Sequence, residues 1–438
     1  MPTFKKIIWS IVNNIVDILI GMGILVVVTR YYNPEIAGKW ILFITIFYMI
    51  TKIRETMMQT AMNKLAAGRT ITQQMAVLKA TLLFTVLFEA LASIILFVLG
   101  ILNTFPSLTE FFLYYPICAV IWAVYRWQIF AHLMSHQVEN IFKSNIGVMI
   151  ILILGLSYIA YYTLPVENIL IVMGIAGTIG AINGIRLIGF KSLFYAQMSR
   201  EVFKGIVYYG SHGMMRGSIN TISNRINIFF TASLLTFVDT AMIGLAYRYS
   251  QLILLPNGAI QSLVLPKFCE AANMNDKQTV KTLFEESVSL LLSLFLLLMV
   301  IASLTAHWLI PLIHGEEYGS GVPIILIIML LTALFMPFGN AFGSVINALE
   351  KPQVNTYLLL MTSSLNISIS FFAMKEWGLW GAVIGTTISE TAGFTVLILI
   401  LKKEIDISLK QCFYLIPTHY LAFLIKAKAL AKKVRKQL

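Results

Sequence analysis

Charged side chains stand inside long apolar stretches of this sequence. Nine basic residues lie within or at the edges of these stretches: Arg30, Lys52, Arg54, Lys79, Arg126, Arg186, Arg216, Arg225 and Arg248. Ammonium and guanidinium groups bind phosphate or carboxylate, and arginine does so with two parallel hydrogen bonds. Three carboxylates, Asp17, Glu89 and Glu390, stand near the middle of such stretches. Carboxylates in this setting often take up protons or cations. The dominance of basic groups predicts an anionic ligand.

Polar residues also form two stripes at helical spacing. At about 100° per residue, one face of the segment 39–60 and its continuation carries Thr45, Tyr48, Lys52, Thr56, Gln59 and Asn63, with Glu55 beside Lys52. The segment 208–234 carries His212, Arg216, Asn220, Ser223, Asn227 and Thr231 on one face. Such a stripe forms either a hydrogen-bonded seam between helices or the wall of a hydrated cavity. A seam alone satisfies an arginine poorly, so Arg216 favours the cavity.

The composition predicts that these residues lie in a membrane protein with many spans. Of 438 residues, 58% are hydrophobic and 12% are charged, and the mean hydropathy is +0.82. Soluble domains are about 25% charged. A soluble enzyme, a disordered chain and a soluble nucleic-acid-binding protein are therefore excluded.

About twelve stretches are long enough to cross a membrane as helices. They lie at 7–30, 39–60, 76–101, 111–132, 146–162, 168–188, 208–234, 242–265, 283–304, 322–346, 354–373 and 380–401. Twelve helices suggest six plus six. We therefore predict an all-α polytopic protein with two six-helix lobes, 1–204 and 205–410, and a tail at 411–438.

The distribution of Lys and Arg predicts the orientation. One set of connections carries twelve basic residues: Lys5, Lys6, Lys64, Arg69, Lys143, Lys191, Arg200, Lys204, Lys267, Lys277, Lys281 and Lys351. The other set carries only Lys39 and Lys375. The positive-inside rule then places both termini in the cytoplasm. Most of the net charge of +12 thus reflects topology and not a nucleic-acid partner. The first apolar run is interpreted as a retained helix, not a signal peptide.

The tail and the glycine pairs carry two further predictions. The segment 412–425 is apolar but too short to span, and basic residues surround it, which favours an amphipathic helix on anionic lipid. Small residues four apart allow helices to approach closely. Such pairs occur at Gly180/Gly184, Gly213/Gly217, Gly339/Gly343 and Gly381/Gly385. Pro256 and Pro337 are expected to kink their helices.

No pattern indicates a cofactor or a resident metal. Cys118, Cys269 and Cys412 are scattered, without the spacing of a zinc site or a disulfide framework. The longest outer connection, about 305–321, holds His307, His314, Glu316 and Glu317, but no helix gives them fixed ligand spacing. No nucleotide-binding loop is present, so transport must use an ion gradient or the substrate's own gradient.

Five loose motifs, in order along the chain, resemble those of a known family. They are Arg30 to Trp40 with its Asn33-Pro34-Glu35 turn, Asn224 to Tyr247 ending at Leu265-Pro266-Lys267, Gly315 to Tyr318, Asn347 to Pro352, and Trp377 to Ala382. With them, the chain resembles the oligosaccharide flippases of the multidrug/oligosaccharidyl-lipid/polysaccharide exporter superfamily, the bacterial O-antigen or polysaccharide transporters. This sequence has Asn227 where the family often has an acid.

The resemblance implies two lobes around a central cavity that opens alternately to either side of the bacterial inner membrane. The implied substrate is a glycan on undecaprenyl diphosphate, moved with H⁺ or Na⁺ as a coupling ion and alongside other polysaccharide assembly proteins. We expect substrate binding by Lys52, Arg216, Arg248, Arg30, Arg225 and Asn220. Asp17 is the first candidate for ion coupling, followed by Glu89 and Glu390.

Three other functions remain open. A multidrug or cation antiporter of the same fold is favoured by Asp17 and opposed by the arginine-rich stripes. A membrane-embedded glycan polymerase or acyltransferase is opposed by the short outer connections. A scaffold that transports nothing is opposed by the polar stripe of segment 208–234.

Overall fold

The chain folds as a bundle of long helices. A computed structural model describes residues 4–66, 69–135, 137–253, 255–421, 423 and 425. Within this part of the chain, helices and two short 3₁₀ turns are the only regular elements. The all-α class is therefore confirmed. The chain divides into two compact units, Met1–Arg225 and Ile226–Leu438, and each is described by itself.

The first unit contains the following elements: α1 (Phe4–Tyr31), α2 (Pro34–Ala66), α3 (Ile71–Ile101), η1 (Pro106–Leu108), α4 (Thr109–Met134), α5 (Val138–Tyr162), α6 (Asn168–Ile188), α7 (Phe190–Tyr195) and most of α8 (Arg200–Leu234). The second contains the end of α8 and α9 (Phe237–Ile253), α10 (Leu255–Asn273), α11 (Lys277–His314), η2 (Glu316–Tyr318), α12 (Val322–Ala333), α13 (Met336–Ala348), α14 (Pro352–Trp377), α15 (Leu379–Ile405) and α16 (Leu409–Tyr414).

Within the described residues, every predicted span falls on helix. The span 322–346 is divided between α12 and α13, and the described residues of 242–265 lie on α9 and α10. Pro337 lies at the start of α13, just after the helical hydrogen bonds are interrupted at Leu334 and Phe335. Pro256 has a helical backbone within α10, and its side chain is outside the described residues. Within the described residues, nine helices are long and apolar enough to span a membrane. The count of twelve stays a prediction.

The turn between α1 and α2 shows why the first motif has its sequence. Asn33 precedes the helix and its side-chain oxygen accepts a hydrogen bond from the Ile36 backbone N–H at 2.9 Å. Pro34 follows as the first helical residue, where a missing N–H costs nothing. Tyr32 donates to the Leu164 carbonyl at 2.6 Å, which ties this turn to the α5–α6 connection. The motif therefore starts α2 at a fixed place.

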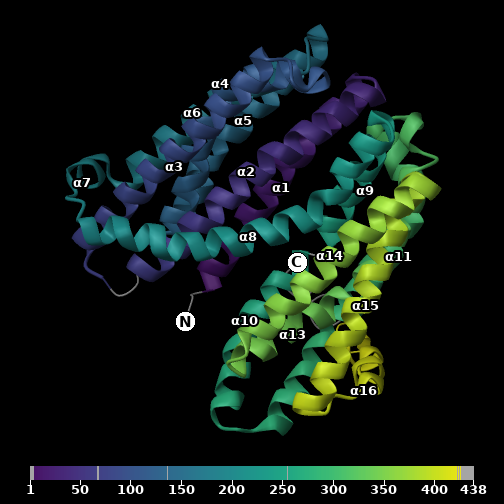
Figure 1. Cartoon of the computed structure of the whole chain (residues 1–438). Coiled ribbons are helices and arrows are strands. Elements are labelled where there is room, and N and C mark those ends of the chain that lie inside the picture. Colours follow the sequence, from purple (N-terminus) through teal and green to yellow (C-terminus); the bar gives the residue numbers. More distant parts are fainter. Residues whose placement is uncertain are drawn as a thin grey trace, which may run out of the picture. The chain divides into compact units, whose positions relative to one another are not determined.

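The first unit is held by aromatic packing and by close helix approach. In Figure 1, α2, α3 and α4 run side by side, with α5 and α6 beside α4. At the end of α2 that follows this turn, the rings of Trp40 and Phe43 pack on Phe111. A Cβ on Gly180 would collide with Tyr125, and one on Gly184 with Gln128. The predicted glycine packing is thus confirmed between α6 and α4.

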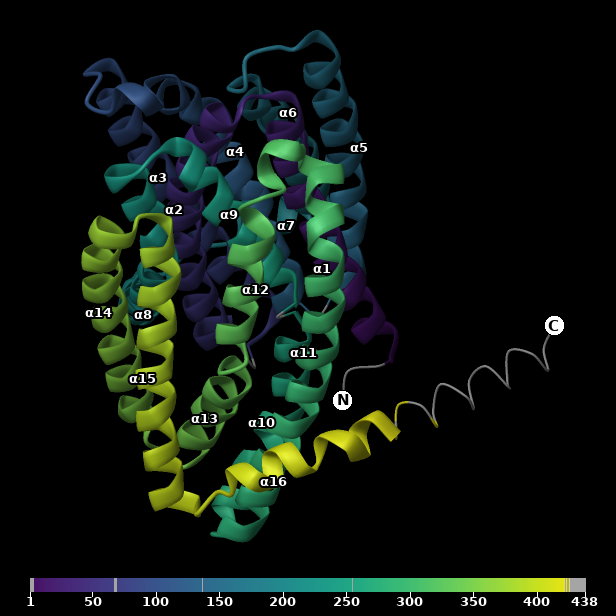
Figure 2. The same cartoon turned by 90° about the vertical axis from the view of Figure 1, so that its right-hand side faces the viewer.

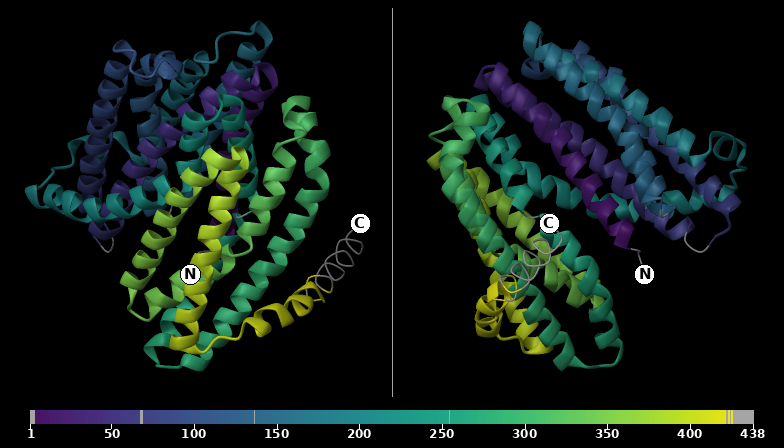
Figure 3. Two further views of the ribbon diagram at one scale, coloured as in Figure 1. Left: turned by 45° about the vertical axis from the view of Figure 1, so that its right-hand side comes forward. Right: turned by 180° about the vertical axis from the view of Figure 1, so that it is seen from behind.

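The second unit is built around α11 and the α14–α15 hairpin (Figures 2 and 3). Gly378 has φ +55° and turns the chain between α14 and α15. A Cβ on Gly381 would collide with the Ala373 backbone, and one on Gly385 with Ser370. The core contains Phe284 and Val288 of α11 with Phe342 of α13. The buried Cys412 of α16 belongs to the same core, so the start of the tail is part of the fold.

Candidate functional site

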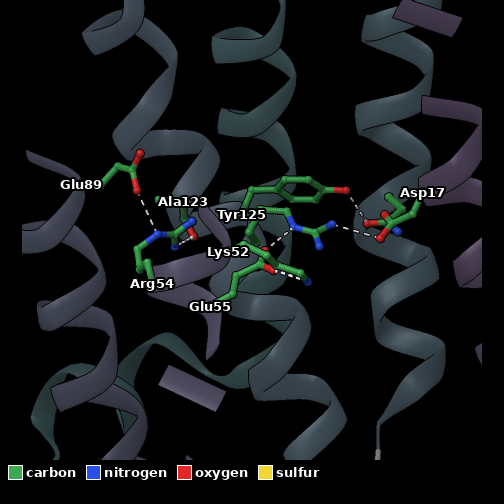
Figure 4. Close-up of polar contacts among 9 residues, drawn as sticks. Asp17, Lys52, Arg54, Glu55, Glu89, Ala123 and Tyr125 are labelled. Carbon is green, nitrogen blue, oxygen red and sulfur yellow. Dashed lines mark hydrogen bonds and ion pairs between the residues drawn. The ribbon is translucent and has the colours of Figure 1, made fainter. Parts of the chain in front are cut away.

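The candidate site is a network of charged side chains in the first unit. Its first members lie on α2, where Lys52, Arg54 and Glu55 stand within one turn of the helix. Lys52 Nζ lies 3.1 Å from Glu55 Oε2. Arg54 points to another side of α2 and its Nε lies 2.9 Å from Glu89 Oε2. Adjacent charges on α2 therefore enter two separate sets of contacts, shown in Figure 4.

Arg126 of α4 joins α2 to α1. Its Nε donates to Glu55 Oε1 at 2.9 Å, and its Nη1 donates to Asp17 Oδ2 at 3.0 Å. The result is a chain of alternating charge, Lys52–Glu55–Arg126–Asp17, carried by three helices. Because the formal charges of these four side chains sum to zero, they can lie at low dielectric without a bound ion. Any cation that binds Asp17 must compete with a guanidinium that is already there.

Tyr125 supports this chain from the neighbouring position on α4. Its hydroxyl donates to Asn145 Oδ1 on α5 at 2.9 Å. The bond fixes the part of α4 from which Arg126 projects. The guanidinium is therefore held in place by its own helix as well as by the two carboxylates.

The contacts of Arg54 form a second, dry set. Its side chain and that of Glu89 are each 1% exposed. Arg54 Nη1 donates to the Ala123 carbonyl at 3.1 Å, and Tyr115 donates to Glu89 Oε1 at 2.5 Å. An ion pair without solvent contact cannot exchange a ligand as it stands. The predicted coupling residue Glu89 therefore lies in a contact that joins α2, α3 and α4.

Two of the predicted anion-binding residues meet on one aromatic ring. The Arg225 guanidinium carbon lies 4.6 Å from the centre of the Tyr48 ring, and Lys52 Nζ lies 5.9 Å from it. Both distances fall within the range of cation–π attraction. The Lys52 side chain is 36% exposed, in contrast to the buried Arg54. We call Tyr48, Lys52 and Arg225 the cationic cluster.

Close approach of α8 to α2 positions this cluster. A Cβ on Gly213 would collide with Thr60, and one on Gly217 with Thr56. The predicted glycine pair thus packs against the polar stripe of α2. This packing holds the first part of α8 against α2, and Arg225, two turns beyond Gly217, reaches Tyr48.

The structure places the other predicted binding residues separately. Arg30 is exposed at the end of α1, and Asn220 is exposed on α8, where it accepts a hydrogen bond from Asn224 at 3.2 Å. Arg248 is half-buried on α9 of the second unit. The backbone of Arg216 is helical within α8, but its side chain lies outside the described residues. The binding roles of all four remain predictions.

The polar stripe of α8 divides into two parts. His212 and Asn220, in the first unit, are exposed. Asn227, in the second unit, donates to Thr386 Oγ1 of α15 at 2.7 Å. Thr231, one turn later, is fully buried. The second part of the stripe is thus a hydrogen-bonded seam, as the alternative interpretation had it. Glu390 is half-buried on α15, without a hydrogen bond or an ion pair to the described residues.

Sequence reasoning missed the roles of Arg126 and Glu55. Both residues were visible as charges in apolar stretches, and Glu55 was noted beside Lys52. Their meeting joins positions 71 residues apart, which no spacing rule relates. At the end of α11, Nε2 of His314 lies 2.7 Å from the Tyr249 hydroxyl. The described residues contain no group of three side chains that could hold a metal ion.

Comparisons with known proteins agree with this picture of the fold. An inward-facing multidrug-resistance MATE family transporter of the MOP superfamily is 13% identical, with 89% of this chain and 94% of that chain covered and a TM-score of 0.76. The lipid II flippase MurJ in an inward closed conformation is 14% identical, with 96% and 92% covered and a TM-score of 0.73. A MOP superfamily transporter from Pyrococcus furiosus, described as having a binding pocket of reversed polarity, is 14% identical, with 91% and 93% covered and a TM-score of 0.60. At these identities the likeness shows the fold.

The family comparison goes further. A search among curated proteins found no match. The family model of polysaccharide biosynthesis proteins, in contrast, matches residues 43–323. This range is more than half of the chain, and it includes α2, α4 and α8, which carry most of the charged network. The chain therefore belongs to the polysaccharide biosynthesis protein family and has the fold of the MOP superfamily transporters.

Proposed function

We propose that this chain is a flippase that carries an undecaprenyl-diphosphate-linked oligosaccharide, such as an O-antigen or other surface polysaccharide unit, across the bacterial inner membrane. The hydrocarbon core of the membrane offers no hydrogen-bond partners to a polar headgroup. A diphosphate and its sugars therefore need a polar surface within the protein in order to cross. The lipid tail can stay in the bilayer. In this proposal both termini are cytoplasmic, the lobes open alternately, and the chain makes and breaks no covalent bond.

The observation that carries the proposal is the cationic cluster. Lys52 and Arg225 converge on Tyr48, and both present donors that suit phosphate oxygens. Glu55 does not require Lys52, because Arg126 already holds its other oxygen at 2.9 Å. Lys52 can therefore leave Glu55 for a diphosphate without leaving a buried carboxylate unpaired. Arg225 lies over the face of the same ring, so the same anion would contact both cations.

We further propose that the coupling ion acts at Asp17. A proton or Na⁺ on Asp17 removes its attraction for Arg126, and Arg126 then keeps only Glu55. The ion would thereby free α1 from α4 while the α2–α4 contact persists. Among the four side chains Lys52, Glu55, Arg126 and Asp17, Asp17 is the most exposed, at 38%. This exposure gives an ion a route to its carboxylate.

The alternative of a multidrug antiporter is less well supported. An organic cation needs a carboxylate that lacks a cationic partner. In the first unit, Asp17 and Glu55 are both held by Arg126, and Glu89 is held by Arg54, so this alternative is left with Glu390 of the second unit. An anion finds Lys52 and Arg225 at the surface of the first unit's network instead.

The experiment is complementation of a strain that lacks this protein, with measurement of undecaprenyl-linked units on each leaflet. We expect such units to accumulate on the cytoplasmic side, and wild type to remove them. Lys52→Ala and Arg225→Ala should each lower transport about ten- to hundredfold, which corresponds to the loss of one charged hydrogen bond. Lys52→Arg should keep most of it.

Arg186→Ala is the matched control, because Arg186 is an exposed arginine at the end of α6 in the same unit. It should transport as wild type does. Cells without build-up of lipid-linked units but with altered resistance to organic cations would replace the flippase with the antiporter. Wild-type transport by Lys52→Ala together with Arg225→Ala would remove the cationic cluster from the proposal.

A further inference from the structure

The segment after α15 has two chemically different faces. Cys412 and Ile416 are buried in the core of the second unit. Tyr414, Leu421 and Ile425 are 70%, 61% and 67% exposed. At about 100° per residue, these three share a face with Lys410, opposite Cys412. Residues 409–414 and 416–421 are helical. The described part of the tail is thus amphipathic, with one face packed on the protein and an apolar face left uncovered.

Three contacts fix the orientation of this helix. Glu285 of α11 accepts a hydrogen bond from the Ser408 backbone N–H at 2.8 Å. The Ser408 hydroxyl accepts from the Gln411 N–H at 3.4 Å and caps α16. Tyr420 donates to the Ser293 carbonyl of α11 at 2.8 Å. Because the helix is tied to α11 at both ends, its exposed face points away from the core in a defined direction.

The place of the helix in the fold brings it next to a bilayer surface. It follows α15 and lies against α11 from Glu285 to Ser293, and Figure 2 shows the yellow segment passing the lower part of α11. α11 and α15 are both long and apolar enough to span a membrane. The apolar run of α11 starts only after Glu285 and Glu286, so a segment that lies against this part of α11 is near the depth of the lipid headgroups.

The charge of the tail selects one kind of lipid. After Asp406 the sequence contains no acidic residue. It contains seven basic ones: Lys410, Lys426, Lys428, Lys432, Lys433, Arg435 and Lys436. Aromatic and aliphatic residues followed by a basic run bind membranes whose headgroups are anionic. Each basic group near such a surface strengthens binding about fivefold.

We propose that the exposed face of residues 409–425 lies in the membrane interface and that this tail binds anionic phospholipid headgroups. Tyr414, Leu421 and Ile425 enter the boundary between headgroups and acyl chains. Lys410 contacts the lipid phosphates, and the basic residues that follow it in the sequence add positive charge to the tail. The tail then links the lipid composition of one leaflet to α11, through the contacts at Glu285 and Ser293.

The test uses the full chain with one spin label. The half-buried Cys269 is changed to Ser, the buried Cys118 and Cys412 are left in place, and Leu421→Cys carries the label. The protein is placed in nanodiscs of phosphatidylcholine, with or without a third of phosphatidylglycerol. The accessibility of the label to oxygen and to a water-soluble nickel chelate gives its depth. We expect the anionic lipid to raise the ratio of oxygen to nickel accessibility at least tenfold.

A label at Asp406→Cys, in the turn before α16 where the side chain is 94% exposed, is the control and should remain accessible to nickel in both nanodiscs. Glutamine at the seven basic positions should abolish the response at residue 421, and arginine should preserve it. Equal thermal unfolding of all variants shows that they fold. A label at residue 421 that stays in water with anionic lipid would overturn the proposal. So would equal burial in both lipids, or the same response to inorganic phosphate alone.

Discussion

At the scale of single residues, Arg126 has the most demanding position in the first unit. It contacts Glu55 and Asp17 with different nitrogens, at 2.9 Å and 3.0 Å. A lysine has one nitrogen and cannot bridge both carboxylates in this way. We expect Arg126→Lys to lower the free energy of unfolding by about 1–3 kcal/mol, the cost of one lost charged hydrogen bond.

The matched variant for this prediction is the double change Arg126→Gln with Asp17→Asn. It removes the charge of Arg126 together with that of one of its partners. Thermal unfolding of the single and double variants gives their coupling energy. The double variant should be more stable than Arg126→Gln alone. Additive effects would mean that Arg126 and Asp17 do not interact in the membrane.

The residue scale also shows what the sequence can and cannot reveal. Lys52 and Arg225 could be selected as candidate binding residues because they are basic residues inside apolar stretches. The structure brings both to the ring of Tyr48. Asp17 and Glu89 were equally visible, but their arginine partners lie 109 and 35 residues away along the chain. Periodicity relates neighbours on one helix. It contains no information on which helix faces which.

At the scale of elements, the α14–α15 hairpin depends on Gly381 and Gly385 of α15, where a Cβ would collide with α14. A side chain at Gly385 would meet the backbone and hydroxyl of Ser370, while Gly339 on α13 has no atom within 4 Å of a Cβ. We expect Gly385→Val to cost about 1–3 kcal/mol of stability or more, as overpacking does. Gly339→Ala should be near neutral. Thermal unfolding in detergent compares the two, and equal loss in both would contradict close packing as the cause.

A connection between elements predicts a pH dependence. Burial raises the pKa of Glu167, and Glu110, which shares a hydrogen bond with it, raises it further. A carboxyl with a higher pKa in the folded state binds protons on folding. The contribution of Glu167 to the free energy of unfolding is fully present below the unfolded-state pKa of about 4.3. It is lost as the pH rises through the pKa of Glu167 in the folded state.

The unfolding temperature of the first unit should therefore fall between pH 4.5 and pH 7.5 through this pair. Glu167→Gln should reduce the fall, because glutamine donates a hydrogen bond to Glu110 at any pH. Scanning calorimetry at both pH values on the wild type and this variant measures the difference. The same slope in both proteins would assign the pH dependence to other groups.

The positions of elements were largely predictable because long apolar runs must form helices in a membrane. The interruption between α12 and α13 needed the tertiary structure. Pro337 signalled a kink, but the helix ends four residues earlier, at Ala333. Proline lacks an N–H and clashes with the preceding turn, so the break appears upstream of it.

At the scale of the whole molecule, the distribution of basic residues predicts which connections face the cytoplasm. Reporter fusions in the full-length gene test this. A reporter that works only outside the cytoplasm should be active after Ser107, in the connection before α4, and inactive after Asn275, before α11. The reverse pattern would invert the topology. The fold does not define which side of the membrane each connection faces, so the reporter activities decide the orientation.

The predicted lobes, 1–204 and 205–410, came from counting helices. The compact units instead meet between Arg225 and Ile226, inside α8. The helix begins at Arg200, close to the predicted boundary, and the two lobes stay a prediction. The first part of α8 packs on α2 through Gly213 and Gly217. These contacts decide that the first part of α8 belongs to the first unit. A count of spans carries no information on such contacts.

The Arg54–Glu89 pair bears on how the protein is made. A helix that entered the bilayer with an unpaired arginine or glutamate would carry a penalty of about 2.5–3.5 kcal/mol for that charge. Arg54 belongs to α2 and Glu89 to α3, the next helix synthesised, and their side chains are 2.9 Å apart. The two charges cancel only when both helices are present. The α2–α3 hairpin, and not either helix alone, is therefore the smallest segment that the insertion machinery can release into lipid in a neutral form at these positions.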